Sequence, residues 1–122
     1  MDPVGLDISY ELIPIRASKT DDFIVLLLNV KNVDKRKKLI SLDVVSNNDQ
    51  IYLDSYRARK KEEFRLGILS EKESREIPVK LFLQKPSARP GLYDISIISY
   101  LHDRDYESYI EKSEFKIQVR VV

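Results

Sequence analysis

Apolar and polar residues alternate along much of this 122-residue chain, with the period of two that is typical of β-strands. The clearest run is Tyr93–Leu101, which follows the turn signal Pro90–Gly91. Leu6–Leu12, Ile77–Leu83 and Phe115–Val121 alternate in the same way. Each run therefore predicts a strand that has one face in a hydrophobic core.

The remaining apolar runs are shorter or less regular. Phe23–Asn32 begins with six consecutive apolar residues, which is typical of a central strand covered on much of both faces. Further strands are expected at Leu39–Val45, at Ile51–Tyr56 and around Phe64–Leu66. An alternative for residues 60–66 is a helical turn. The chain thus predicts strand after strand, with polar turns between them.

Seven or eight short strands of this kind predict an all-β fold, an Ig-like antiparallel β-sandwich. Tyr93, two residues after Gly91, suits a tyrosine corner, in which a phenol near the start of a strand fixes a neighbouring loop. We expect residues 1–122 to form one domain, because a chain of this length buries about two-thirds of its unfolded surface around a single core.

Composition narrows the function classes. The formal net charge of +1 provides no overall field to attract nucleic acid or an anionic membrane. The absence of cysteine excludes disulfides, thiolate metal sites and a cysteine nucleophile. With only three glycines, the chain lacks the glycine-rich loops of P-loop and Rossmann nucleotide sites. The longest apolar run, Phe23–Leu28, is too short to span a bilayer.

Three segments resemble CARDB-type and related Ig-like (fibronectin type III-like) sandwiches of archaea and bacteria. Leu28–Asp34 resembles a strand that ends in V-x-N-x-G, Leu66–Val79 a hairpin of the form L-G-x-L-x-x-G-E-S-x-x-I-x-V, and Pro90–Tyr93 the turn P-G-x-Y. Asp34 and Lys72 replace glycines of that pattern, so both turns are expected to be built differently. The resemblance implies a non-catalytic module of surface, secreted or carbohydrate-active proteins, without transferable active-site residues.

One set of apolar residues is a candidate for an exposed binding surface. If Ile24, Leu26 and Leu28 face the core, the residues between them must point outward, because side chains alternate across a strand. In an Ig-like topology the strand containing Phe82 is the neighbour. The outward residues therefore predict a contiguous patch that binds a protein partner or a second copy as a homodimer: Phe23, Val25, Leu27 and Phe82.

Two basic clusters support an alternative function, the binding of nucleic acid or another anionic ligand. They follow predicted strands and consist of Lys35, Arg36, Lys37 and Lys38, and of Arg57, Arg59, Lys60 and Lys61. Two strands separate them, so alternating strand direction predicts that both loops lie at one end of the sandwich. Nearby carboxylates at Asp34, Glu62 and Glu63 offset much of this charge, which makes nucleic acid the less favoured partner.

The acidic turn after Leu101 is the other polar candidate. Asp103, Asp105 and Glu107 alternate and could converge on calcium, the one cofactor considered, although Arg104 lies between them and the EF-hand glycine is missing. His102 is the single histidine, and no G-x-S-x-G motif accompanies it. We therefore expect a solvated loop histidine and a protein that is not an enzyme.

The sequence leaves the compartment open. Met1–Gly5 has neither the basic nor the apolar part of a secretion signal. We expect a cytoplasmic protein if the chain is complete, and an extracellular or cell-surface one if a signal or anchor has been removed. A charged fraction of 34% without cysteine also suits a thermophile, in which ion-pair networks gain value.

Overall fold

The computed structural model describes residues 5–122, which contain strands and no helix. The alternating runs and the apolar run Phe23–Asn32 lie in strands as predicted, with the run Leu6–Leu12 extended to Ile13, and the helical alternative at residues 60–66 is wrong. The strands are β1 (Leu6–Ile13), β2 (Arg16–Ala17), β3 (Phe23–Asn32), β4 (Lys38–Ser46), β5 (Ile51–Tyr52), β6 (Lys61–Leu69), β7 (Ser74–Leu83), β8 (Gly91–His102) and β9 (Glu111–Val121).

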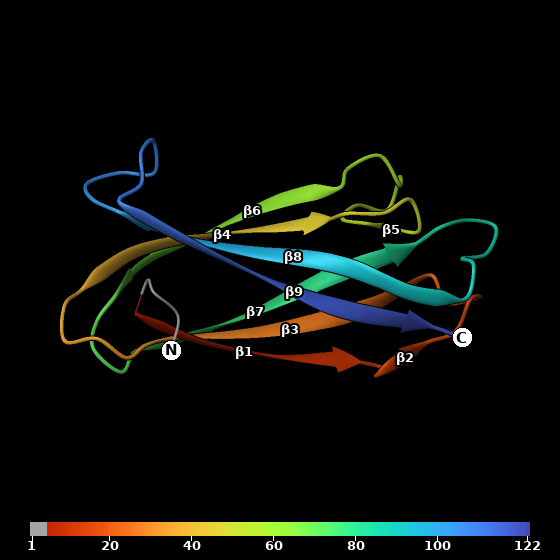
Figure 1. Ribbon diagram of the computed structural model, residues 1–122, viewed down its shortest axis with the longest axis horizontal. Coiled ribbons are helices and arrows are strands. Elements are labelled where there is room, and N and C mark those ends of the chain that lie inside the picture. The colour runs from red at the N-terminus through yellow and green to blue at the C-terminus, as the bar shows by residue number, and fades with distance from the viewer. Residues whose placement is uncertain (1–4) are drawn as a thin grey trace.

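The strands form two sheets, which lie as two layers in Figure 1. The first, sheet A, has the order β1-β3-β7-β5, and the second, sheet B, has the order β2-β9-β8-β4-β6. All pairings are antiparallel except that of β2 with β9. The prediction of a purely antiparallel fold is therefore wrong at this one position.

The structure has nine strands in residues 5–122, where seven or eight were predicted. The additional strand is β2, whose two residues lie next to a polar turn and show no strand pattern in the sequence. The strand predicted at Ile51–Tyr56 shrinks to the two residues of β5, whereas the short piece around Phe64 becomes the nine-residue β6. Both differences concern strand length, which a short apolar run does not determine.

One hydrophobic core joins the two sheets, because alternate side chains of the central strands face each other across the interior. Sheet A contributes β3 and β7 residues, and sheet B contributes residues of β4, β8 and β9. The fully buried members include Ile24, Leu26, Leu28, Leu81, Ile40, Leu42, Val44, Ile95, Ile97 and Val119. Because all of β3 alternates between buried and less buried positions, only one of its faces lies in the core, not both as predicted.

A buried amide closes the core at the end of β3. Asn32 is fully buried, and its Nδ2 donates hydrogen bonds to the carbonyls of Leu69 (2.9 Å) and Arg36 (2.8 Å). Its Oδ1 accepts a hydrogen bond from the N–H of Asp34 at 2.9 Å. The asparagine of the V-x-N-x-G segment therefore ties the β3–β4 loop to the end of β6. Lys72, at the glycine position of the hairpin motif, adopts a positive φ of 64°.

The predicted tyrosine corner is present. Tyr93 lies near the start of β8, and its hydroxyl donates a 2.6 Å hydrogen bond to the carbonyl of Arg89 in the preceding loop. We expect Tyr93→Phe to lower the free energy of unfolding by about 1 kcal/mol, because one intramolecular hydrogen bond is lost and its acceptor can still reach water. Urea denaturation checks this value, and an unchanged midpoint would show that the hydroxyl does not fix the loop.

Candidate functional site

The four predicted interface residues come together on the outer face of sheet A. Phe23 on β3 is the register partner of Phe82 on β7, and their ring centroids are 5.6 Å apart. Val25 and Leu27 follow Phe23 at alternate positions on the same face of β3. The alternation of β3 therefore places the predicted residues side by side.

Register pairing extends this surface by two residues that the sequence did not single out. Ile13 of β1 lies opposite Val25, and Pro78 of β7 lies opposite Leu27. Ile13 is 48% exposed and Phe23 is 39% exposed, while Val25 and Leu27 are half-buried. Only the pairing register could have identified the two additions. We call this surface the Phe23 patch: Ile13, Phe23, Val25, Leu27, Pro78 and Phe82.

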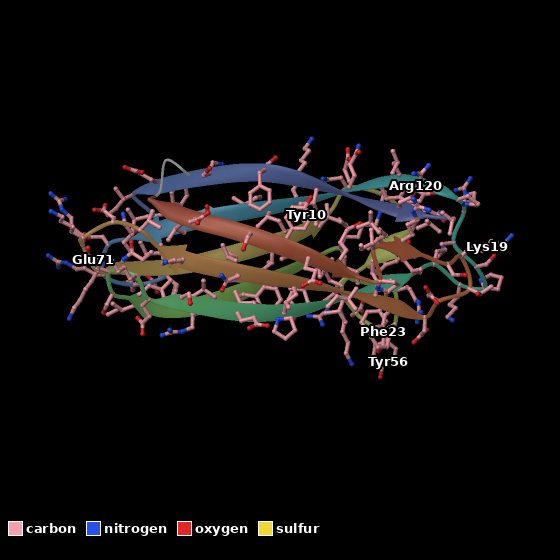
Figure 2. All side chains as sticks on the ribbon, turned by 90° about the horizontal axis from the view of Figure 1, so that it is seen from below. Tyr10, Lys19, Phe23, Tyr56, Glu71 and Arg120 are labelled. Carbon is pink, nitrogen blue, oxygen red and sulfur yellow. The ribbon has the colours of Figure 1, made fainter. Side chains whose placement is uncertain are left out.

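Two cations lie over the aromatic rings of the Phe23 patch. The Nζ of Lys80 is 4.8 Å from the ring centroid of Phe23, and the guanidinium of Arg57 is 5.6 Å from that of Phe82. Arg57 also donates to Oδ1 of Asp22 at 2.6 Å and to the carbonyl of Leu83 at 2.9 Å. Two hydrogen bonds lower the pKa of Asp22: that from Arg57 has the larger effect, and that from Lys85 the smaller. The β5–β6 loop is thus held against one edge of the patch, where Figure 2 shows Tyr56 near Phe23.

The two basic clusters lie at opposite ends of the molecule, which contradicts the prediction of one basic tip. The β3–β4 connection with Lys35–Lys38 lies beside the β8–β9 connection, whereas Arg57–Lys61 follows β5 at the other end (Figure 1). The reason is the length of β5, because a strand of two residues does not cross the sandwich. The acidic turn lies at the end opposite Arg57–Lys61, together with Lys35–Lys38.

Carboxylates pair with several of the predicted anion-binding residues. Ion pairs join Lys38 to Asp34 (3.2 Å), Lys60 to Asp49 (2.6 Å) and Lys61 to the buried Asp43 (3.4 Å), in addition to the pair of Arg57 with Asp22. The hollow beside the β3–β4 loop has a volume of about 540 Å³, and its charged lining is mixed: Asp34, Arg36, Lys37, Lys38, Asp103 and Glu111. Neither end presents a uniformly basic surface for an anion.

The acidic turn does not assemble a metal site. Within residues 5–122, no group of three or more His, Asp or Glu side chains is placed to hold a metal ion. Asp103, Asp105 and Glu107 are all exposed, and Oδ1 of Asp105 accepts a hydrogen bond from the N–H of Glu107 at 3.0 Å. The three carboxylates do not converge, because the segment is a loop and not a strand, and Asp105 instead bonds within the turn.

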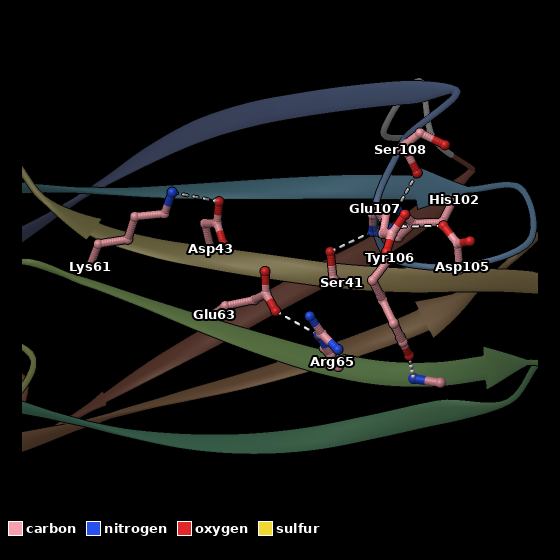
Figure 3. Close-up of polar contacts among 11 residues, drawn as sticks. Ser41, Asp43, Lys61, Glu63, Arg65, His102, Asp105, Tyr106, Glu107 and Ser108 are labelled. Carbon is pink, nitrogen blue, oxygen red and sulfur yellow. Dashed lines mark hydrogen bonds and ion pairs between the residues drawn. The ribbon is translucent and has the colours of Figure 1, made fainter.

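His102 is buried, which contradicts the prediction of a solvated loop residue. It ends β8 on the outer face of sheet B, where Nδ1 lies 2.7 Å from the carbonyl of Ser108 and Nε2 lies 2.7 Å from Oγ of Ser41 (Figure 3). A carbonyl only accepts, so Nδ1 carries a proton and Nε2 accepts from the Ser41 hydroxyl in the neutral ring.

The residues around His102 connect the β8–β9 loop to the outer face of sheet B. Tyr106 stacks edge-on to the imidazole at 5.1 Å, and its hydroxyl accepts a hydrogen bond from the N–H of Gly67 at 2.9 Å. Arg65 lies 4.7 Å from the Tyr106 ring. Ser41 is itself buried, so a substrate cannot reach its hydroxyl. The cluster holds the β8–β9 loop across the outer face of β4 and β6.

Comparisons with known proteins indicate the fold alone. No protein-family model matches the chain, and no curated protein matches it. Among solved structures, the human CEP192 PapD-like domain 7 is 11% identical at a TM-score of 0.52, with 100% of this chain and 89% of that domain covered. This similarity, together with the shared core, supports a β-sandwich.

Two further structures have a TM-score of 0.49. They are the bacterial hydrophobin BslA (14% identity, 97% of this chain and 95% of that one) and the Pseudomonas fluorescens alkylpurine DNA glycosylase AlkC bound to DNA containing an abasic site analog (13% identity, 92% of this chain). This chain covers 30% of the glycosylase.

In residues 5–122 no helix is long and apolar enough to cross a membrane.

Proposed function

We propose that this chain is an Ig-like β-sandwich that acts as a non-catalytic binding or assembly module through the Phe23 patch. In support, the order β1-β3-β7-β5 and the run β9-β8-β4 within sheet B match strands A, B, E, D and G, F, C of an Ig-type sandwich, while β2 and β6 lie outside this match at the two edges of sheet B. The tyrosine corner at Tyr93 and the resemblance of Leu28–Asp34 to CARDB-type modules support the same assignment.

The observation that carries the proposal is the continuity of the Phe23 patch across three strands. Monomeric proteins rarely expose contiguous apolar surface of this kind unless it serves binding. Charged side chains surround the patch: Lys80 and Arg57 lie along the β7 side, and Glu11 lies on the β1 side. An apolar centre with a charged rim is the usual anatomy of a protein–protein interface.

The charges at the rim favour a second copy as the occupant. When two such faces pack about a two-fold axis parallel to β3, β7 of one copy lies over β1 of the other. Lys80 and Ile13 occupy one register row, and Glu11 occupies the next. Each Lys80 then lies within reach of the partner's Glu11, twice by symmetry. Stable contacts of this type bury about 800 Å² per partner.

The test is the molar mass in solution. We expect wild-type protein to form dimers at high concentration, and Val25→Lys with Leu27→Lys to be monomeric, because four buried ammonium groups would face each other. Asp7→Lys with Ser74→Lys is the matched control, since it changes exposed positions of the same face two register rows beyond Leu27. Sedimentation equilibrium checks the masses.

Charge reversal tests the orientation of the two copies. Lys80→Glu or Glu11→Lys alone should weaken the dimer about tenfold, and the double variant should recover much of the loss because opposite charges again face each other. A wild-type protein that remains monomeric at millimolar concentration would contradict the proposal. A dimer that the Val25 and Leu27 changes leave intact would show that another surface is used.

A further inference from the structure

Among residues 5–122, no strand pairs with the outer edge of β1, and the backbone groups of that edge are arranged for pairing. Within residues 5–122, β1 pairs only with β3. The N–H of Val33 donates to the carbonyl of Gly5 at 3.3 Å, which fixes which residues bond to β3, because bonded and non-bonded pairs alternate in an antiparallel ladder. The odd-numbered residues of β1 therefore bond to β3. Ile8, Tyr10 and Leu12 direct their N–H and C=O groups to the open edge.

The other long sheet edges carry residues that discourage pairing with an added strand. On β7, the bond from Leu83 N–H to the Asp22 carbonyl places Pro78 among the edge-directed residues, and proline supplies no donor. On β6, the bond from Ser46 N–H to the Lys60 carbonyl places Lys61, Glu63 and Arg65 at the edge. β9 carries Lys112 and Lys116, and β2 covers its end. β1, with the sequence LDISYELI, has neither lysine nor proline.

A groove accompanies the open edge. It has a volume of about 470 Å³, lies between β1 and β9, and includes Tyr10, Leu12 and Ile15 in its lining, with Arg16 and Arg120 at one end. Tyr10 is 48% exposed and Ile15 is 78% exposed. Figure 2 shows Tyr10 and Arg120 along this side of the molecule. A strand added to β1 would place every second side chain over this groove.

The charged residues of β1 determine which kind of strand can be added to its edge. Asp7 and Glu11 are the only charged residues of β1, and both lie on the outer face of sheet A. Neither has an ion-pair partner among residues 5–122. A second β1 in the register centred on Ser9 would place Asp7 directly opposite Glu11, and like charges in that position are unfavourable. A strand with basic side chains on that face is complementary.

We propose that β1 is a docking edge for an extended peptide segment that carries basic side chains at alternate positions and apolar side chains between them. The backbone of the segment bonds to Ile8, Tyr10 and Leu12. Its basic side chains lie beside Asp7 and Glu11, and its apolar side chains cover the groove. This is strand addition, in which main-chain bonds supply affinity and alternate side chains supply specificity.

Amide hydrogen exchange measured by NMR tests the proposal, with a terminally blocked nine-residue peptide of alternating lysine and valine as the probe. In the free protein the amides of Ile8, Tyr10 and Leu12 should exchange fast, and those of Ser9 and Glu11 slowly. Saturating peptide should slow the first set about tenfold or more, because each of these N–H groups gains an acceptor. A peptide of alternating glutamate and valine should not.

Two variants separate this edge from the Phe23 patch. Asp7→Lys should weaken protection by the lysine peptide several-fold, while Glu76→Lys, an exposed change on β7, should not. Asp7 lies outside the patch, so dimer formation should be unaffected and failure of one proposal leaves the other standing. Unchanged exchange with the lysine peptide, or equal protection by the acidic one, would overturn the docking edge. So would protection without peptide that grows with protein concentration, since a second copy would then occupy it.

Discussion

Replacing Asn32 with alanine is expected to lower the free energy of unfolding by roughly 3 kcal/mol or more. The side chain is fully buried and forms three hydrogen bonds, with the carbonyls of Leu69 and Arg36 and with the N–H of Asp34. Alanine leaves the buried carbonyl of Leu69 without a partner, which costs about 1–3 kcal/mol. It also removes the part-buried bonds to the Arg36 carbonyl and the Asp34 N–H, which contribute about 1 kcal/mol each. The loss is a large part of the stability of a typical domain.

Asn29→Ala is the matched control for this experiment. Asn29 lies on the same strand but on the exposed outer face, so its replacement should change stability by about 0.5 kcal/mol or less. Urea denaturation with a constant m-value measures both variants. If the two variants unfold at the same urea concentration, the amide of Asn32 does not hold the β3–β4 loop, and the structural reading of the V-x-N-x-G segment is wrong.

The sequence was most informative where a strand has one buried face. On β3 the alternation of Ile24, Leu26 and Leu28 with Val25 and Leu27 places each set on its own face, because period two is a property of the extended backbone itself. The Phe23 patch was therefore largely predictable before the register was known. Ile13 and Pro78 were not, since their position beside β3 depends on pairing between distant segments.

The arrangement of the loops could not be derived in the same way. Whether Arg57–Lys61 lies near Lys35–Lys38 depends on the number of strands that cross the sandwich between them. β5 pairs with β7 in sheet A through only two residues, although its sequence has enough apolar residues for a longer strand. Tertiary pairing sets its length, and local pattern does not.

The polar cluster at His102 was not predictable from the chain either. Ser41, His102 and Tyr106 come from β4, β8 and the loop after it, and each alone has the appearance of an ordinary surface residue. The pairing of β4 with β8 places Ser41 and His102 together, and the loop then covers them. A single histidine two residues after Tyr100 and four before Tyr106 was the available signal, and it does not specify burial.

Replacing His102 with leucine is expected to lower the free energy of unfolding by about 2–3 kcal/mol, because the Ser41 hydroxyl and the Ser108 carbonyl each lose a buried partner. Asp103→Ala, an exposed change one residue away, is the control and should stay within about 0.5 kcal/mol of wild type. The loop should also detach, so the amide of Gly67, which donates to Tyr106, should exchange faster.

A double-mutant cycle distinguishes the hydrogen bond from simple packing at this position. When Ser41→Ala accompanies His102→Leu, both ends of the Ser41–His102 bond are removed, and the double variant should be more stable than the sum of the single losses predicts. The coupling between the two sites should reach about 1 kcal/mol, as expected for residues in direct contact. If the two losses simply add, Ser41 and His102 stabilise the protein independently, and the loop is held by Tyr106 packing instead.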